Sequence, residues 1–102
     1  MIGYAVMVRH RVLPGRRDEV WEVWRRWMGP AVAENPGHLA YFYHFDEQDP
    51  DVIVAYQRYR DAEAAEAFLR TEAYASYTAE VEPLLAGPPV VTVLRTLWAK
   101  DA

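Results

Sequence analysis

The sequence predicts an α+β domain in which helices cover one face of an antiparallel sheet. Two observations support this prediction. Four short segments alternate their side chains with a period of two, as strands do, and the segments between them repeat at three and four residues, as amphipathic helices do. In chain order they read β-α-β-β-α-α-β, and no repeat, linker or low-complexity segment divides the chain. We therefore expect one domain over residues 1–102, near the usual domain size.

The first half of the pattern is one strand followed by one long helix. Residues 2–13 alternate with a period of two, and Pro14-Gly15 ends this strand. From Arg16 an apolar stripe predicts a helix that lasts until Pro36-Gly37. Because Pro30 lacks a backbone donor, we expect a kink or a restart near Met28. The apolar stripe consists of Val20, Trp24, Trp27 and Ala31.

The second half predicts a hairpin, two short helices and a last strand. Segments 38–46 and 52–60 are separated by a polar turn, which predicts an antiparallel pair. Asp61 is positioned to cap a helix that ends at about Arg70, and Thr71 to cap the next one. The apolar stripe of this last helix is Tyr74, Tyr77, Val81, Leu84 and Leu85, and Gly87-Pro88-Pro89 stops it before a strand over 90–98. The whole pattern is a split βαβ arrangement, typical of the ferredoxin-like fold.

Both faces of the predicted sheet carry apolar side chains. One face of segment 38–46 carries Leu39, Tyr41, Tyr43 and Phe45, and the other carries His38, Ala40, Phe42 and His44. Segment 52–60 is similarly apolar on both sides. A sheet with helices on one face normally has a polar opposite face. We therefore expect a second copy of the chain to cover the outer face in a homodimer; the alternative is a sheet with an exposed apolar patch.

Composition excludes several classes of function. The formal net charge is −4 and no Lys/Arg cluster recurs on one face, so nucleic acid is not an expected partner. The chain has no cysteine, which excludes disulfides and thiol catalysis. No apolar run reaches the roughly 20 residues of a membrane span. Residues 1–8 lack the basic region and cleavage site of a secretory signal, so a cytoplasmic protein without membrane partners is expected. No metal-binding spacing and no cofactor-binding motif is present.

His10 is the candidate catalytic residue. It shares a strand face with Val6, Val8 and Val12, which predicts that it points toward the helices. A neutral imidazole there could act as a base toward an acidic phenol or enol. The alternative is a core histidine whose ring is satisfied by a backbone carbonyl. For His44, on the opposite face of its strand, we expect a solvated or interface position.

Aromatic side chains are the candidate substrate-binding residues. Large rings on a helix stripe are usually core, yet several indoles facing tyrosines also suit a flat aromatic guest between helices and sheet. The residues with this predicted role are Trp24, Trp27, Tyr41, Tyr43, Tyr56, Phe68, Tyr74 and Tyr77. Arg9, Arg11 and Arg58 could stabilise an oxyanion if they face a pocket, and salt bridges are the alternative use.

Several segments, taken in order, resemble the antibiotic biosynthesis monooxygenase family. They begin with Val8–Gly15 and continue with Glu34–Tyr41, which reads E-x-P-G-x-L-x-Y. The hairpin turn at Asp49-Pro50 follows, and then Tyr56–Asp61 at the change from strand to helix. The last matches are Thr71, Tyr74, Tyr77, Pro83-Leu84-Leu85 and Pro88. No single motif is specific, but their order and spacing together are, and the resemblance covers almost the whole chain.

The resemblance implies a dimeric α+β barrel and oxygen chemistry without a bound cofactor. The substrate expected from the family is an aromatic or quinoid small molecule whose anion reacts with O₂. Phe68 stands where many members carry a histidine, which leaves a non-catalytic dimeric binding protein as the alternative. Haem degradation is not expected, because that branch uses residues absent at the positions of about Val8, Phe68 and Thr78.

Overall fold

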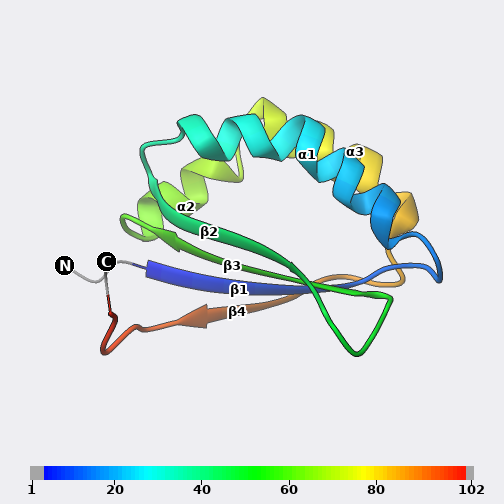
Figure 1. The fold of residues 1–102 in the computed structure, drawn as a ribbon. Helices are drawn as coiled ribbons and strands as arrows, with labels where there is room; N and C mark the ends of the chain where they lie inside the picture. The colour runs from blue at the N-terminus through cyan, green and yellow to red at the C-terminus, as the bar shows by residue number, and fades with distance from the viewer. Residues whose placement is uncertain (1–3, 101–102) are drawn as a thin grey trace.

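The computed structural model describes residues 4–100 and shows a four-stranded antiparallel sheet with its α-helices on one face (Figure 1). The strands are β1 (Tyr4–Arg11), β2 (His38–Phe45), β3 (Val52–Tyr59) and β4 (Val90–Leu94). The helices are α1 (Arg17–Glu34), α2 (Ala62–Phe68) and α3 (Glu72–Val81), and a 3-10 turn, Glu82–Leu84, follows α3. The predicted order β-α-β-β-α-α-β is confirmed. Residues 2 and 3 of the predicted first strand lie outside the described residues.

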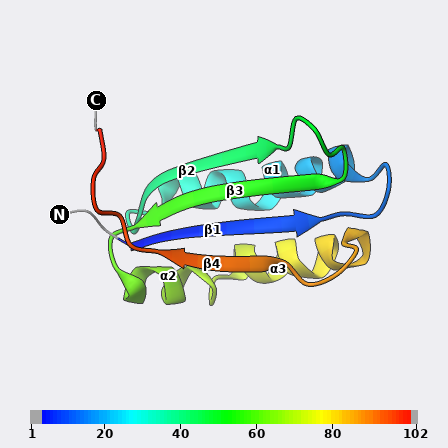
Figure 2. The ribbon, with the colours of Figure 1, turned by 90° about the horizontal axis from the view of Figure 1, so that it is seen from below.

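The strands are ordered β2-β3-β1-β4 across the sheet. Helix α1 joins β1 to β2 and leaves a gap between them, which β3 fills by pairing antiparallel with both strands. Strand β4 then pairs with the free edge of β1. This is the split βαβ arrangement of a ferredoxin-like fold. Seen from below, α1 lies behind β2 and β3, while α2 and α3 lie on the side of β1 and β4 (Figure 2).

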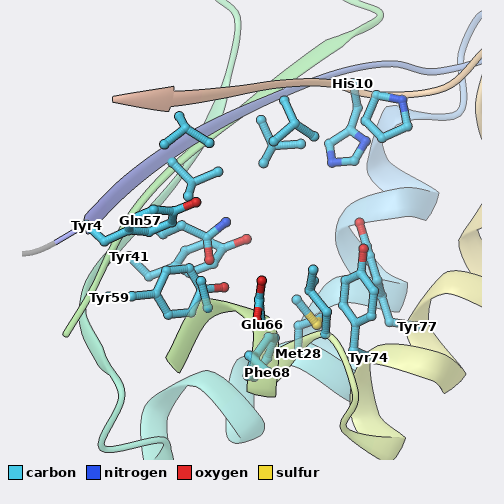
Figure 3. A pocket seen from close by; sticks show the side chains of 17 residues that line it. Tyr4, His10, Met28, Tyr41, Gln57, Tyr59, Glu66, Phe68, Tyr74 and Tyr77 are labelled. Carbon is cyan, nitrogen blue, oxygen red and sulfur yellow. The ribbon is translucent and has the colours of Figure 1, made fainter. Parts of the chain in front are cut away.

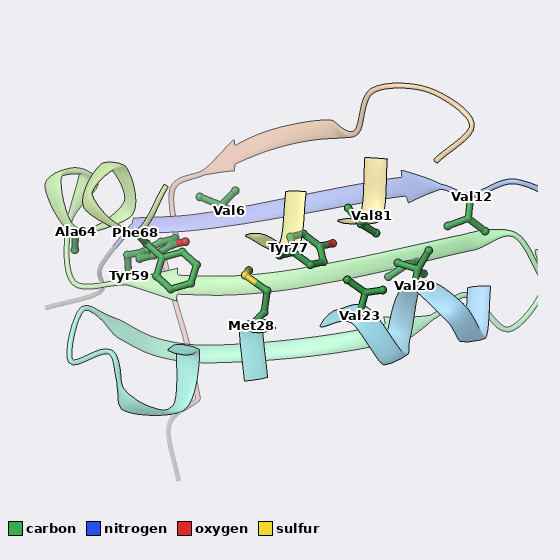
Figure 4. Packing of buried hydrophobic residues seen from close by; sticks show 11 residues of the cluster. Val6, Val12, Val20, Val23, Met28, Tyr59, Ala64, Phe68, Tyr77 and Val81 are labelled. Atoms are coloured by element: carbon green, nitrogen blue, oxygen red, sulfur yellow. The ribbon is translucent and has the colours of Figure 1, made fainter. Parts of the chain in front are cut away.

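The core lies between the sheet and the helices (Figure 4). Helix α1 contributes Val20, Val23 and Met28, and α3 contributes Tyr77 and Val81. From the sheet, alternate residues of β1 and β3 point to the same side, as the period of two requires. The sheet and loop members of this cluster are Val6, Val12, Ile53 and Tyr59, and α2 adds Ala64 and Phe68.

Side chains fix the ends of the elements. Asp61 accepts a hydrogen bond from the Ala64 N–H, and Thr71 accepts one from the Tyr74 N–H, so both predicted caps are confirmed. At the β2–β3 hairpin, the guanidinium of Arg17 donates to the backbone carbonyls of Asp46, Asp49 and Val52, at 2.9, 2.9 and 3.1 Å. The start of α1 is thereby tied to the hairpin turn.

The restart of the helix near Met28 does not occur, and the predicted end of the last strand was wrong. Helix α1 runs without a break through Pro30, because this proline lies on the exposed side, where water can solvate the carbonyl that loses its donor. Strand β4 ends at Leu94 rather than at residue 98. The last pair between β4 and β1 is Leu94 with Ala5, near the start of β1.

The predicted face of His38 was also wrong. The register shifts between His38 and Ala40, where a β-bulge places an extra residue in β2. His38 therefore pairs opposite Tyr59 and lies on the helix side with Tyr41, instead of on the outer face. Leu39 is the residue that the irregularity leaves exposed.

Candidate functional site

A cavity of about 220 Å³ lies between the sheet and helices α2 and α3 (Figure 3). Its wall consists mainly of aliphatic and aromatic side chains. The aliphatic part comes from β1, β4 and Met28, and the aromatic part from Tyr4, Tyr41, Tyr59, Phe68, Tyr74 and Tyr77. Besides the tyrosine hydroxyls, the polar side chains in the wall are His10, Gln57 and Glu66. An apolar space with a few polar groups is the usual form of a small-molecule site.

A second cavity, of about 450 Å³, adjoins the first at its α3 end. The two share His10, Tyr74, Tyr77 and Pro89 in their walls. The second extends along the end of α3 and the loop that leads into β4. His10 thus stands where the two cavities meet, and its side chain lines both.

His10 has the properties of a neutral base. Its position on β1, opposite Ile53, turns the imidazole toward the helices. The Nδ1 atom is buried and has no hydrogen-bond partner among residues 4–100. Burial lowers the pKa of His10 below 6.5, so the ring is uncharged near pH 7. An uncharged buried nitrogen without a partner is able to accept a proton or a hydrogen bond from a ligand.

The hydroxyls of Tyr41 and Tyr77 in the cavity wall are protonated donors. Burial raises the pKa of Tyr41 to about 12 and raises that of Tyr77 as well. The indole N–H of Trp24 donates to the Tyr41 oxygen at 3.2 Å, which leaves the phenol hydrogen of Tyr41 for another acceptor. In Figure 3 the hydroxyls of Tyr74 and Tyr77 point toward the strand that carries His10.

The structure brings some of the predicted site residues together and leaves others apart. His10, Tyr41, Phe68, Tyr74 and Tyr77 line the first cavity. The remaining four, Trp24, Trp27, Tyr43 and Tyr56, do not line it.

Trp24 and Tyr43 pack against each other under α1, with ring centroids 4.9 Å apart. Trp27 is exposed, and its indole N–H donates to Glu80 at 2.7 Å. Tyr56 lies on the outer face of the sheet, where its ring stacks on that of Phe42. Trp24 therefore contacts the cavity wall through Tyr41, by a hydrogen bond and by ring packing.

Comparison with known proteins identifies the family. A sequence profile of the antibiotic biosynthesis monooxygenase family matches residues 3–80. The chain belongs to this family. No curated protein matches the chain. Membership supports a monooxygenase-like role in general terms.

Solved structures share the fold of this family member. A Nitrosomonas europaea protein, whose name proposes it as an antibiotic biosynthesis monooxygenase, superposes with a TM-score of 0.86 at 21% identity, over 93% of this chain and 99% of its own. A Caulobacter crescentus protein with a similar name gives 0.86 at 22% identity, over 93% and 90%. A Mycobacterium tuberculosis protein gives 0.83 at 26% identity, over 96% and 98%. The ferredoxin-like α+β fold is thereby shown.

Sequence reasoning missed Gln57 and Glu66, which line this family member's cavity, and His38, which contacts Gln57. Gln57 is 7% exposed and faces the cavity from β3, between the buried residues Ala55 and Tyr59 of the same face. A polar residue in an otherwise apolar alternation was the signal that could have found it. His38 lies directly behind Gln57, with Nε2 2.9 Å from Oε1. No pattern marked it, because the bulge in β2 changes its face.

Three features are not found among residues 4–100. Among residues 4–100, no group of three or more His, Asp or Glu side chains is arranged to hold a metal ion. In the same part of the chain, no helix has both the length and the apolar character that a membrane crossing requires. The predicted oxyanion-stabilising arginines Arg9, Arg11 and Arg58 do not line either cavity.

Proposed function

We propose that the protein is a monooxygenase without a bound cofactor that oxidises an electron-rich aromatic or quinoid small molecule with O₂. The observation that carries the proposal is the imidazole of His10 in the wall of an apolar, ring-lined cavity, with a buried Nδ1 that has no partner within residues 4–100. General base catalysis requires such a group close to an acidic C–H or O–H, with a pKa near or below the working pH. Family membership gives independent support.

The proposed chemistry balances without a cofactor. His10 takes a proton from an activated CH₂ of the substrate, and the resulting carbanion adds O₂ to form a peroxide anion. The imidazolium returns its proton to the terminal oxygen, and loss of water then leaves a carbonyl on the same carbon. One atom of O₂ enters the product and the other leaves as water, and the substrate carbon supplies all the electrons. The apolar wall favours these steps because it keeps bulk water from the anion.

Oxygen uptake with a panel of anthrones, which carry the activated CH₂ that this chemistry requires, tests the proposal. We expect one O₂ consumed for each molecule of anthrone converted to quinone, at a rate above the spontaneous oxidation. Replacing the base, His10→Ala, should lower the enzymatic rate by about 10²-fold or more. His44→Ala, which changes an exposed histidine on the outer face, is the matched control and should keep the rate. Full activity in His10→Ala would exclude this residue as the base, and no uptake with any substrate of the panel would refute the function.

A second candidate is a binding protein without catalysis. Phe68 lines the cavity and is 3% exposed, and the sequence resemblance places it where many family members are expected to carry a histidine. His10 is then the one imidazole in the cavity wall within residues 4–100. Tight binding of an anthrone that is recovered unchanged under O₂ would favour this candidate over the enzyme.

We also propose that a second copy of the chain covers the outer face of the sheet. This face exposes large apolar side chains, with Met7 37%, Phe42 55% and Val90 60% accessible. A patch of this kind on a monomer favours association. Light scattering should give twice the chain mass of 11.8 kDa, and Phe42→Asp should give the single-chain mass. A wild-type monomer at micromolar concentration would refute the dimer.

A further inference from the structure

A chain of hydrogen bonds leads from the turn before β2 to the wall of the cavity. It begins at the backbone N–H of Gly37, which can only donate, and which donates to Oδ1 of Asn35 at 3.2 Å. The amide nitrogen of Asn35 is therefore the atom that faces His38, 2.9 Å from Nδ1. Because an amide nitrogen also only donates, Nδ1 of His38 must be the acceptor.

The same reasoning fixes the proton on His38. An imidazole that accepts at Nδ1 carries its proton on Nε2 when it is neutral. Nε2 then donates to Oε1 of Gln57 at 2.9 Å. Burial lowers the pKa of His38, which favours this neutral form. The rings of Tyr59 and Phe68, with centroids 4.3 and 4.7 Å from that of His38, hold the imidazole in place.

Gln57 is the last member of this chain of hydrogen bonds and lines the cavity. Since its oxygen is the acceptor for His38, its amide nitrogen forms the other branch of the side chain. This nitrogen has no hydrogen-bond partner among residues 4–100, and Gln57 lines the cavity. Tyr41 is its direct cross-strand partner and offers a second hydrogen, because Trp24 already donates to its oxygen. Figure 3 shows the two groups at one end of the cavity and His10 toward the other.

We propose that the Gln57 amide and the Tyr41 hydroxyl together bind an acceptor oxygen of an aromatic ligand, and that His38 and Asn35 are positioning residues which turn the Gln57 donor toward it. The oxygen is that of a ketone, quinone or enolate, since both protein groups donate. Gln57 pairs with Val6, four residues before His10 on β1, or about 13 Å of strand. The ligand thus carries its acceptor oxygen at the end remote from the group that reaches His10.

The proposal deepens the proposed function and rests on the same cavity, but binding can be measured without turnover. The probes are 9-fluorenone and fluorene, which share one planar frame and differ by a carbonyl oxygen. Fluorenone has no acidic C–H, so its binding is independent of base catalysis. With two donors, we expect the protein to prefer fluorenone to fluorene by roughly 25-fold, at about fivefold for each hydrogen bond. The carbonyl stretch of bound ¹³C-labelled fluorenone should shift to lower wavenumber.

Three variants remove the donors or their support. Gln57→Met and Tyr41→Phe keep side-chain volume and each remove one donor, so each should lower fluorenone affinity about fivefold and leave fluorene affinity unchanged. His38→Phe keeps a ring between Tyr59 and Phe68 but releases the Gln57 amide to turn. It should split the carbonyl band into bonded and free components. His44→Phe, which changes an exposed histidine of the same strand, is the control and should keep the single shifted band.

The outcomes separate this site from the proposed function. Equal binding of fluorenone and fluorene by the wild type, or an unshifted carbonyl band, overturns the donor site. A single shifted band in a folded His38→Phe overturns the positioning role. If Gln57→Met does not fold, the fluorenone affinity of Tyr41→Phe and the carbonyl spectrum of the wild type still test the donor site. A shifted band in a protein that consumes no O₂ supports the donor site and refutes the monooxygenase. O₂ consumption together with an unshifted band supports the monooxygenase and refutes the donor site.

Discussion

Replacing His10 with leucine should stabilise the fold while it removes the proposed base. The Nδ1 atom of His10 is buried without a partner within residues 4–100. A buried polar group that makes no hydrogen bond costs about 1–3 kcal/mol. The imidazole is half-buried and borders the cavity, so we take the lower end of this range. His10→Leu should therefore raise the free energy of unfolding at pH 7.5 by about 1 kcal/mol.

The same substitution should reduce the dependence of stability on pH. Burial lowers the pKa of His10 in the folded protein below its unfolded value near 6.5. Between these two pKa values the unfolded chain binds more protons, so the wild type loses stability as the pH falls from 7 through 6.5 to the folded pKa. Leucine removes this loss. The pKa of His38 is also lowered, so His38 still contributes to the pH dependence of stability in the variant.

Urea unfolding at pH 5 to 8, followed by circular dichroism, measures both effects. The stability gain of His10→Leu should be larger at pH 5.5 than at pH 7.5. His44→Leu changes an exposed histidine on the outer face and is the control for a general increase in apolar content. A His10→Leu protein that is less stable than the wild type at every pH, with the same pH dependence, would refute the reasoning that the imidazole lowers stability.

Three further predictions follow from single contacts. Arg17→Ala should lower the free energy of unfolding by about 2–3 kcal/mol, because its guanidinium donates to three hairpin carbonyls. Arg16→Ala is the control: it loses one exposed ion pair and should lower the free energy of unfolding by less than about 1 kcal/mol in the same urea titration. Gly37→Ala should lower the free energy of unfolding by about 1–3 kcal/mol, because the new Cβ would stand 3.0 Å from the methyl group of Ala64 in α2. In the control Gly87→Ala, the new Cβ meets nothing within 4 Å, so the thermal midpoint should stay unchanged. If His10 is the base, kcat/KM should fall on the acid side of its pH profile with a midpoint below pH 6.5. The reason is that the lowered pKa of His10 keeps its base form populated at lower pH. A midpoint above pH 6.5 would contradict this assignment.

The sequence predicted those features that depend on local periodicity. Strict alternation in β1 placed His10 on the helix side, and the structure has it there, opposite Ile53. Asp61 and Thr71 were recognisable as caps because short acceptor side chains preceded helical stripes. The stripe that begins at Tyr74 also predicted which side of α3 would face the core and the cavity.

Features that depend on tertiary contacts could not be predicted in this way. A bulge shifts the face of every residue on one side of it, so alternation counted back from Tyr41 placed His38 on the wrong face. The period of α1 gave the correct helix but not the centre of its buried stripe. Val20, Val23 and Met28 form that centre, and Trp24 and Trp27 lie on its two flanks, against β2 and α3. Large rings at the edge of a stripe have the same spacing as rings at its centre.

The position of α1 over β2 and β3, and of α2 and α3 beside β1 and β4, gives the molecule two regions with different tolerance to change. Val20, Val23 and Ile53 belong to the densely filled region, where a change of volume lowers stability. Much of the cavity wall belongs instead to two short helices and a five-residue edge strand. Substitutions there can alter the shape of a bound molecule's surroundings while the packed region continues to hold the fold. Relatives can therefore diverge in ligand preference on one shared framework.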